Sequence, residues 1–498
     1  MLVVAVLFLF ALAVFAIAFY LRFLDSFKAF ETNGIKGPKP SFPFGNFKKT
    51  LTGKCNFVDE LSEIYEEFKG TERFVRVFMT RKPQLFILDS KLSKEILVEN
   101  FKHFSNNVSS KWSTAKDDVL RKCSPFVCTG NDWKSRRTEI VPVLSSTRMK
   151  GFHPKTKRIC QKLCNFIDSK LRGEESVDVK ALAYNFTAEF VSDFIWGIDA
   201  RAFTKSAPCE LIQMKDAMIQ QAFKCVKAYF LSDLLPFFGN RRFFSKLSDK
   251  FFVGLLKKLL AEDSNCGRSD FLNHLEKLKV AKELSESELT GHTTTVVIDG
   301  IETAGALIAH CLLLLARNEN SQEKLRQEIN DTLDGEDFPT FDRLNELTYL
   351  EQCLYETLRI FPPLPFFNKI CTEDFYLENS EGKEIRVAKG DEILISAYAF
   401  HKDEEFYSDP EMFIPERFDN DGIKDYRNRE VLIPFGDGPR VCLGNKFGLY
   451  EAKVAVAEIL RNYKISVDKT RTRSDNECSP GGFLLSLNSG IFLKFNKI

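Results

Sequence analysis

The chain has 498 residues, and its 70 basic and 69 acidic side chains give a formal net charge of +1 at pH 7. This balance gives no sign of the strongly basic surface that nucleic-acid-binding proteins carry. No low-complexity spacer or internal repeat divides the sequence, which favours one large body over several domains. The 13 cysteines are odd in number and irregularly spaced, a pattern that suits a reducing cytosol better than a disulfide framework.

The N-terminal segment predicts a membrane anchor. Residues 2–21 are apolar and uncharged, and at about 1.5 Å per residue a helix of this length crosses a bilayer core. Basic residues follow at once, which places the rest of the chain on the cytosolic side. A cleaved signal peptide is the alternative, but the segment lacks a basic start and exceeds the usual apolar core of roughly 7–15 residues. We therefore expect an anchor over residues 1–21, a basic linker rich in Pro and Gly over 22–46, and the main domain over 47–498.

The main domain is predicted to be mainly α-helical with a minor β-sheet. Helical spacing is clear in segments such as the one that carries Leu449, Ala452, Val456, Ile459 and Leu460 on one face. The expected β segments are Phe74–Phe78, Pro83–Leu88, Glu392–Ile395 and Gly490–Phe495.

A first pair of polar side chains lies in a predicted helix near residue 135. Trp133 and Arg137 are four residues apart and so share one face of that helix. The indole N–H and the guanidinium fork both suit carboxylate ligands. The pair therefore indicates a place where a carboxylate could bind.

A long apolar helix is expected over residues 285–316. Ser285 and Glu288 have the spacing of a capping box at its start. From residue 296 onward the run is almost wholly apolar, broken mainly by Asp299, Glu302 and Thr303. Because a carboxylate in so apolar a helix is costly without a partner or a function, these polar residues are candidates for a reactive site.

A second helical pair is Glu356 and Arg359, which lie three residues apart on one face. Pro362 and Pro363 then end the helix. An isolated Glu-x-x-Arg pair is ordinarily a solvated ion pair, so this spacing by itself assigns no function.

The segment from Phe435 to Gly444, FGDGPRVCLG, places one cysteine where a thiolate could hold a haem iron. Its three glycines allow tight turns and close approach to a flat ligand. Cys442 stands just before a predicted amphipathic helix, whose N-terminus favours an anionic sulfur. Arg440 can reach a carboxylate of the same ligand. A lone buried cysteine is more often structural, and the surrounding pattern is what favours the metal ligand.

These motifs, in this order, resemble those of the cytochrome P450 family, in particular its animal, insect-like microsomal class. Phe435, Gly438, Arg440, Cys442 and Gly444 fill the fixed positions of that family's haem loop. The resemblance runs from about residue 30 to the C-terminus. It implies the P450 fold with an N-terminal transmembrane anchor, and haem (iron protoporphyrin IX) as the cofactor.

The resemblance also implies roles around the haem. Cys442 would be the axial ligand of the iron, and Glu356, Arg359 and Arg417 would form a structural network beneath the haem loop. The expected cofactor-binding residues, of which Lys369 replaces a more usual arginine, are Trp133, Arg137, Lys369, Phe435, Arg440, Cys442 and Gly444.

The segment DGIETA resembles the family's oxygen-activation motif. Glu302 and Thr303 would be the acid and alcohol that deliver protons. Asp299 and Ala304 depart from the family pattern, and Asp299 is expected to change the polarity of the pocket. Residues expected to line that pocket are Ile301, Leu364, Phe366 and Phe367.

The function implied is that of a haem-thiolate monooxygenase that inserts one oxygen atom from O2 into a lipophilic small molecule, of xenobiotic, steroid or fatty-acid-like character. No flavin- or nicotinamide-binding motif is found in the sequence, so electrons would come from NADPH–cytochrome P450 reductase, with cytochrome b5 as a second candidate partner. The enzyme would sit in the endoplasmic reticulum membrane with its catalytic domain in the cytosol. Basic residues expected to meet an acidic redox partner are Lys134, Arg136, Lys424, Arg427, Arg429 and Lys446.

Two functional alternatives stay open. One is a reductase-independent P450 isomerase or dehydratase, against which the Glu302–Thr303 pair argues. The other is a non-catalytic haem-binding or sensing protein, which the unusual Asp299 and Ala304 leave possible. The Phe-rich segment 228–244 is expected to touch the bilayer and to cover the pocket.

Overall fold

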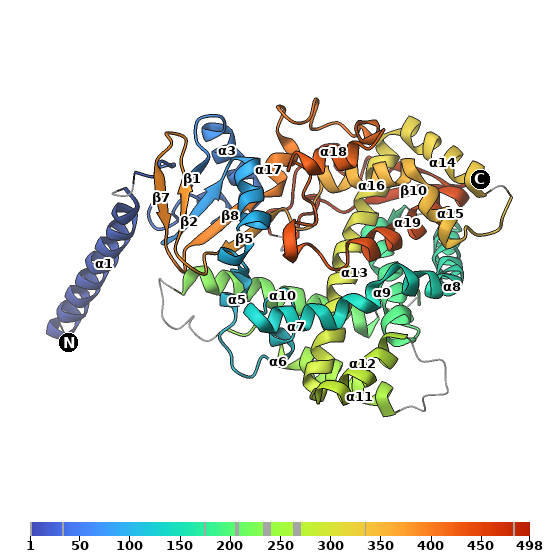
Figure 1. Ribbon diagram of the computed structural model, residues 1–498, viewed down its shortest axis with the longest axis horizontal. Helices are drawn as coiled ribbons and strands as arrows, with labels where there is room; N and C mark the ends of the chain where they lie inside the picture. The colour runs from blue at the N-terminus through green and yellow to red at the C-terminus, as the bar shows by residue number, and fades with distance from the viewer. Residues whose placement is uncertain are drawn as a thin grey trace.

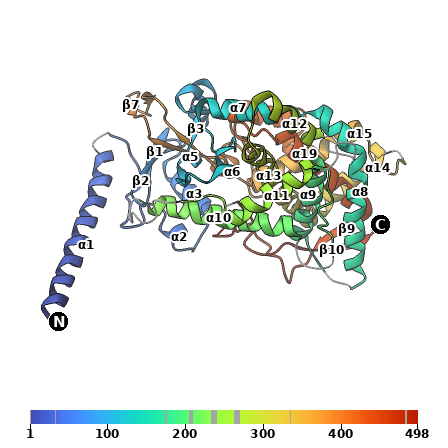
Figure 2. The same cartoon turned by 90° about the horizontal axis from the view of Figure 1, so that it is seen from below.

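The computed structural model describes residues 2–31, 34–173, 176–204, 209–232, 241–261, 270–333, 335–481 and 484–498. Figure 1 shows a helix-rich body with the largest β-sheet at one end and strand β10 of a smaller sheet toward the other, and a single N-terminal helix that stands apart from the body. The view at right angles in Figure 2 shows the same separation. The expectation of a mainly α-helical fold with a minor sheet is confirmed.

The helix that stands apart is α1 (Leu2–Glu31). Many of its apolar side chains are exposed, among them Val3, Leu9 and Ile17. Only its C-terminal part touches the body, where Phe23 is fully buried and packs edge-on against Phe42. The helix continues ten residues beyond the apolar span, into the segment expected as a linker.

The largest sheet lies at the α1 end of the body. Its strands follow the order β1-β2-β8-β5-β3, and all neighbours are antiparallel except β2 and β8. Phe74, Val75, Val77 and Met79 of the first strand enter an apolar core of their own, separate from the helical core. The strands are β1 (Phe74–Met79), β2 (Lys82–Ile87), β8 (Glu392–Ser396), β5 (Phe366–Ile370) and β3 (Asn106–Asn107).

Two smaller sheets complete the strands of the described chain. The C-terminal sheet has the order β4-β10-β9, and a hairpin pairs β6 with β7. All four expected β segments are confirmed, with boundary shifts of a few residues. The strands are β4 (Val177–Asp178), β9 (Tyr463–Val467), β10 (Phe492–Lys497), β6 (Phe375–Glu378) and β7 (Glu384–Val387).

The helices form the rest of the body, and they enclose the larger apolar core. Those before the central helix are α2 (Lys48–Leu51), α3 (Phe57–Phe68), α4 (Ser90–Lys94), α5 (Ser109–Trp112), α6 (Val119–Lys122), α7 (Gly130–Ile140), α8 (Ser146–Leu171), α9 (Val179–Trp196), α10 (Glu210–Leu231), α11 (Lys246–Ala261) and α12 (Asp270–Lys282). Those after it are α14 (Glu319–Leu333), α15 (Phe341–Glu346), α16 (Thr348–Ile360), α17 (Ala397–Lys402), α18 (Gly422–Asn428) and α19 (Asn445–Asn462). A π-helical turn, Glu95–Glu99, follows α4.

The central helix is α13 (Glu286–Arg317), which runs through the middle of the body in both views. It begins as predicted, because the Ser285 side chain accepts from Glu288 N–H and the Glu288 carboxylate accepts from Ser285 N–H. By length and composition α13 could cross a membrane, yet 78% of its apolar window is buried inside the protein. We therefore assign α13 to the core.

The predicted membrane-touching segment 228–244 is only partly described. Residues 233–240 lie outside the described residues. Of the part that is described, Phe243 and Phe244 are buried in the helical core.

Candidate active site

The loop that carries Cys442 spans residues 435–444 and leads into α19. Cys442 N–H donates to the carbonyl oxygen of Phe435 at 2.9 Å, which closes the loop on itself. Gly438 has φ +67°, and a Cβ added there would lie 2.0 Å from the carbonyl oxygen of Leu97. The loop therefore packs on the π-helical turn at a distance that only glycine permits.

The Cys442 side chain points into an internal cavity and is exposed there. Because the sulfur lies deep inside the protein, burial raises the pKa of the Cys442 thiol to about 11. Gly444 N–H donates to the sulfur and opposes this rise. The start of α19 three residues later does not outweigh this effect. A bound metal ion, in contrast, displaces the proton and stabilises the thiolate directly.

The cavity lies between the Cys442 loop and α13 and has a volume of about 360 Å³. Phe435, Cys442 and Gly444 line it on the loop side. A Cβ added at Gly444 would meet nothing within 4 Å, so this stretch of backbone is open toward the cavity. The geometry leaves room for a flat group against the loop.

Cationic side chains gather at one end of the cavity. Arg440 lies over the Trp133 ring, 4.5 Å from its centroid, and donates to the carbonyl oxygen of Cys128 at 2.8 Å. Arg137 donates to the carbonyl oxygen of Val441 at 2.9 Å. Lys369 Nζ donates to Asn107 Oδ1 at 3.0 Å.

None of these three cations has a carboxylate partner within the described part of the chain. Burial, with Arg440 nearby, lowers the pKa of Lys369 to about 7. Burial likewise lowers the pKa of Arg440 to about 10. Buried positive charges without a counter-charge are unfavourable, and an anionic ligand would stabilise them. Together with the thiol and the open loop, it fits a haem whose propionates lie at this end.

The polar residues of α13 divide between two faces of the helix. Asp299 and Thr303 line the cavity, one helical turn apart, and Thr303 Oγ1 donates to the carbonyl oxygen of Asp299 at 2.7 Å. Ala304 and Gly300 line it as well. Burial raises the pKa of Asp299 to about 7.

Glu302 lies outside this lining and is held by α9 and α10. Tyr184 Oη donates to its Oε1 at 3.0 Å, and Lys215 Nζ donates to its Oε2. Lys215 is only 2% exposed and also lies over the Tyr184 ring, 4.1 Å from its centroid. The expected acid and alcohol are therefore adjacent in sequence but face different surroundings.

The expected pocket residues are also divided. Leu364, Phe366 and Phe367 line the cavity. Ile301 differs from the expectation, because its side chain is fully buried outside the lining and its carbonyl oxygen accepts from Thr187 Oγ1 at 3.1 Å.

Glu356, Arg359 and Arg417 lie together, as the resemblance implied. The Glu356 carboxylate accepts from Arg359 at 2.8 and 2.9 Å and from Arg417 Nε at 3.1 Å. Arg359 also donates to the carbonyl oxygen of His401 at 2.8 Å. Burial lowers the pKa of His401 to about 3, so its neutral ring accepts Ile433 N–H at 3.1 Å, two residues before the Cys442 loop begins.

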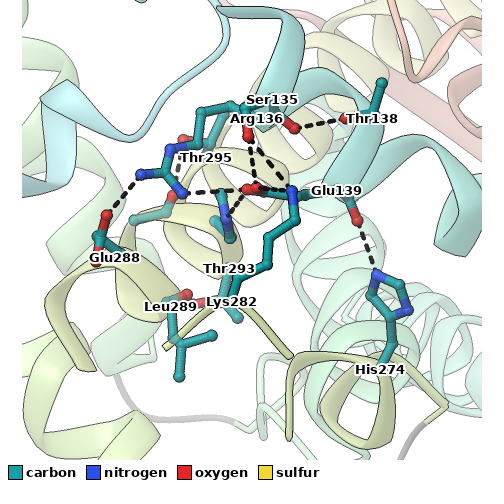
Figure 3. A network of polar contacts seen from close by, with 12 residues as sticks. Ser135, Arg136, Thr138, Glu139, His274, Lys282, Glu288, Leu289, Thr293 and Thr295 are labelled. Atoms are coloured by element: carbon teal, nitrogen blue, oxygen red, sulfur yellow. Dashed lines mark hydrogen bonds and ion pairs between the residues drawn. The ribbon is translucent and has the colours of Figure 1, made fainter. Parts of the chain in front are cut away.

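A further network surrounds Glu139 at the end of α7 (Figure 3). Its carboxylate accepts from Arg136 at 3.1 Å and from Lys282 of α12 at 2.7 Å. His292 Nε2 of α13 lies 2.8 Å from Glu139 Oε2. Burial alone would raise the pKa of Glu139, but His292, Lys282 and Ser135 together hold it well below its ordinary value.

This network corrects the expectation for Arg136. Its guanidinium turns inward to Glu139 and Glu288, so it does not present a free charge to a redox partner.

Three functional neighbours were missed from the sequence. Lys215 and Tyr184 belong to helices far from Glu302 in the chain, and no local spacing marks them. Glu139 does carry a signal, since it lies three and four residues after Arg136 and Ser135 and so shares their helical face.

The comparisons with known proteins agree with this geometry. The family model described as "Cytochrome P450" matches residues 35–495. "Probable cytochrome P450 28d1" of Drosophila melanogaster is 36% identical over 499 residues, which cover 98% of each chain. "Probable cytochrome P450 28d2" of the same organism is 36% identical over 95% of each chain. "Probable cytochrome P450 309a2", also from Drosophila melanogaster, is 31% identical over all of this chain and 94% of its own length.

Proposed function

This chain belongs to the cytochrome P450 family, and from that premise we propose that it oxidises a lipophilic small molecule with electrons from NADPH–cytochrome P450 reductase. As a member of the family it is a haem-binding monooxygenase that uses O2, a small-molecule substrate and a redox partner. The observation that carries the proposal is the apolar cavity between Cys442 and α13. Cytochrome b5 is proposed as an additional electron donor.

The haem, when bound, supplies the iron chemistry that activates dioxygen. Cys442 is proposed as its axial ligand, because it is the cysteine whose side chain faces the cavity from the loop. Arg137, Lys369 and Arg440 would hold the propionates by charge, with the Trp133 N–H as a further donor. Phe435 and Gly444 shape the surface on which the ring would rest.

Proton handling is proposed for Thr303 and Glu302, from two different positions. The Thr303 hydroxyl lies in the cavity and is already fixed by its bond to the carbonyl oxygen of Asp299. Glu302 lies on the outer side of α13, in its ion pair with Lys215. A proton that leaves Glu302 therefore has to pass around the helix to reach Thr303.

An apolar substrate is supported by the lining itself. Phe243, Phe244, Leu364, Phe366 and Phe367 all face the cavity. Their burial excludes water from the reacting group and favours ligands that partition from lipid. Xenobiotic, steroid and fatty-acid-like molecules share this property.

A location in the endoplasmic reticulum membrane, with the body in the cytosol, is supported by α1. This helix has 30 residues and exposes most of its described large apolar side chains. Such a surface is stable in lipid and unfavourable in water. The residues 1–21 would form the anchor, 22–46 the connection and 47–498 the catalytic domain.

The test is a comparison of the wild-type protein with Cys442→Ser, each expressed with haem, reduced and exposed to carbon monoxide. We expect the strongly red-shifted Soret band of thiolate ligation in the wild type and its loss in the variant. NADPH oxidation with purified reductase is then expected for the wild type alone. A histidine-type band in both proteins would move the ligand elsewhere, and turnover of a peroxide without reductase would favour the isomerase or dehydratase alternative.

A further inference from the structure

The carboxyl group of Asp299 has no hydrogen-bond or ion-pair partner among the described residues. It lines the cavity from α13, and burial is the one cause found for its raised pKa. In contrast, the buried carboxylates Glu139 and Glu356 and the half-buried Glu302 are each bound by at least one cation. Glu451 is also buried without a partner, but it lies in α19 outside the lining of the cavity.

The Asp299 side chain is exposed to the cavity, whose walls around it are largely apolar. Its neighbours along the cavity face of α13 are mostly apolar or carry a hydroxyl, as in Thr295, Val296 and Thr303. The Thr295 and Thr303 hydroxyls already donate to carbonyl oxygens of the helix, at 2.9 and 2.7 Å. A carboxylate in such a place is stabilised when a cation or a hydrogen-bond donor enters beside it.

The other charges of the lining do not supply that partner. Arg137, Lys369 and Arg440 belong to the end of the cavity assigned to the propionates. The remaining described lining cation, Arg121, donates to the carbonyl oxygen of Ser110, and the acid that affects its pKa is Asp118. The other acidic lining residue, Asp437, accepts from Gly438 N–H within the loop.

We propose that Asp299 is a recognition group for substrates that carry a positively charged nitrogen on an apolar framework. This inference rests on the proposed function and narrows its substrate class from lipophilic molecules in general to lipophilic amines. The apolar framework would contact Phe243, Phe366 and Phe367, and the cationic nitrogen would pair with Asp299. A neutral substrate of the same shape would leave the carboxyl desolvated and unpaired.

The experiment compares a matched pair of ligands on the full-length haem-loaded protein. One is 4-phenylbutyl-trimethylammonium, and the other is its neutral isostere, in which a tert-butyl group replaces the trimethylammonium group. A quaternary nitrogen has no lone pair, so it cannot bind the iron and confuse the result. Dissociation constants are measured by calorimetry for the wild type, Asp299→Asn and Asp299→Ala.

We expect the wild type to bind the cation about tenfold to hundredfold more tightly than the isostere. Both variants should lose that preference, while their affinity for the isostere stays the same or rises. Equal affinities in the wild type, or a preference that survives in Asp299→Asn, would overturn the proposal. Equal losses for both ligands in the variants would assign Asp299 to cavity structure and would also overturn it.

A second measurement separates this inference from the proposed function. Each protein is first checked for the thiolate-type carbon monoxide spectrum and for reductase-dependent oxidation of the neutral isostere. If the wild type passes both checks but does not prefer the cation, only the role of Asp299 is wrong. If the wild type fails them, the proposed function itself is wrong.

Discussion

Two acidic residues differ in their surroundings. Glu356 of α16 is fully buried and accepts hydrogen bonds from both Arg359 and Arg417. Asp299 of α13 faces the largely apolar cavity, and its carboxyl group has no partner among the described residues. The first region is a closed set of charges in which each group satisfies the others. The second leaves one group unsatisfied.

The difference follows from what each region has to do. Beneath the loop, fixed charges hold backbone carbonyls and, through His401, the segment that leads to Cys442. Such a network gives a rigid position and no binding capacity. On α13 the structure retains an unpaired polar group, which is unfavourable for stability and useful for binding or reaction.

The largest effect is expected for Arg359→Met, which removes one of the two cations that pair with Glu356. Loss of the guanidinium leaves Glu356 buried with only Arg417, and we expect a destabilisation of about 3–5 kcal/mol, together with poor haem incorporation. Urea unfolding and the haem content of the purified protein measure the two effects. Arg386→Met is the matched control, because the Arg386–Asp374 pair is exposed and screened by solvent, so its loss should hardly change stability. Similar losses in the two variants would contradict the closed-network interpretation.

Gly438→Ala tests the loop itself and should have the next largest effect. The left-handed φ and the collision with the Leu97 carbonyl would displace the loop, at an expected cost of about 1–3 kcal/mol. The readout is the fraction of protein with a thiolate-type carbon monoxide spectrum. Gly151→Ala in α8, where an added Cβ meets nothing within 4 Å, is expected to be neutral or stabilising by up to about 1 kcal/mol.

Lys215→Met removes the cation that pairs with Glu302 of α13. Glu302 then resembles Asp299, because neither carboxyl group has an ion-pair partner among the described residues. Removal of the cation leaves the Glu302 carboxylate with the Tyr184 hydroxyl as its described side-chain partner. We expect a destabilisation of about 1–3 kcal/mol and a lower rate of reductase-dependent turnover. Asp216→Asn removes the exposed second partner of Lys215 and serves as the control. An unchanged turnover rate in Lys215→Met would argue against a role of Glu302 in proton handling.

Asp299→Asn should give the smallest change in stability, and in the opposite direction. The folded-state pKa of about 7 lies above the ordinary value of 3.8, so the carboxyl destabilises the fold increasingly as pH rises from about 4 and most fully above 7. The amide removes this penalty. We expect a gain of about 1 kcal/mol at pH 8, after allowance for solvent in the cavity, and a smaller one at pH 5. The measurement is the unfolding midpoint of the wild type and of Asp299→Asn at the two pH values. A larger gain in stability at pH 5 than at pH 8 would show that the Asp299 carboxylate is paired.

The sequence was most informative where a signal is local. The capping box at Ser285, the short apolar run of β1 and the glycines of the Cys442 loop each depend on a few neighbouring residues, and each reappears in the structure. The pairing of Glu356 with Arg417, by contrast, joins residues 61 apart and was expected only because of the family resemblance.

The different surroundings of Asp299 and Glu302 could have been predicted in part. In an α-helix, residues four apart share a face, so Asp299 and Thr303 belong together, while Glu302 lies about 100° around from Thr303. The partner of Glu302 could not have been predicted in this way. Lys215 lies 87 residues away, and only the packing of α9 and α10 against α13 brings it there.

The position of the short helix α7 also bears on how well the protein resists proteolysis in a cell. It carries Trp133 and Arg137 at the cavity and Glu139 in the contact with α12 and α13. Chains that have not yet received haem keep three uncompensated cations at one end of this helix, so its docking is weakest before the cofactor arrives. Locally opened segments are the preferred targets of proteases. Haem binding would therefore also protect this part of the chain from proteolysis.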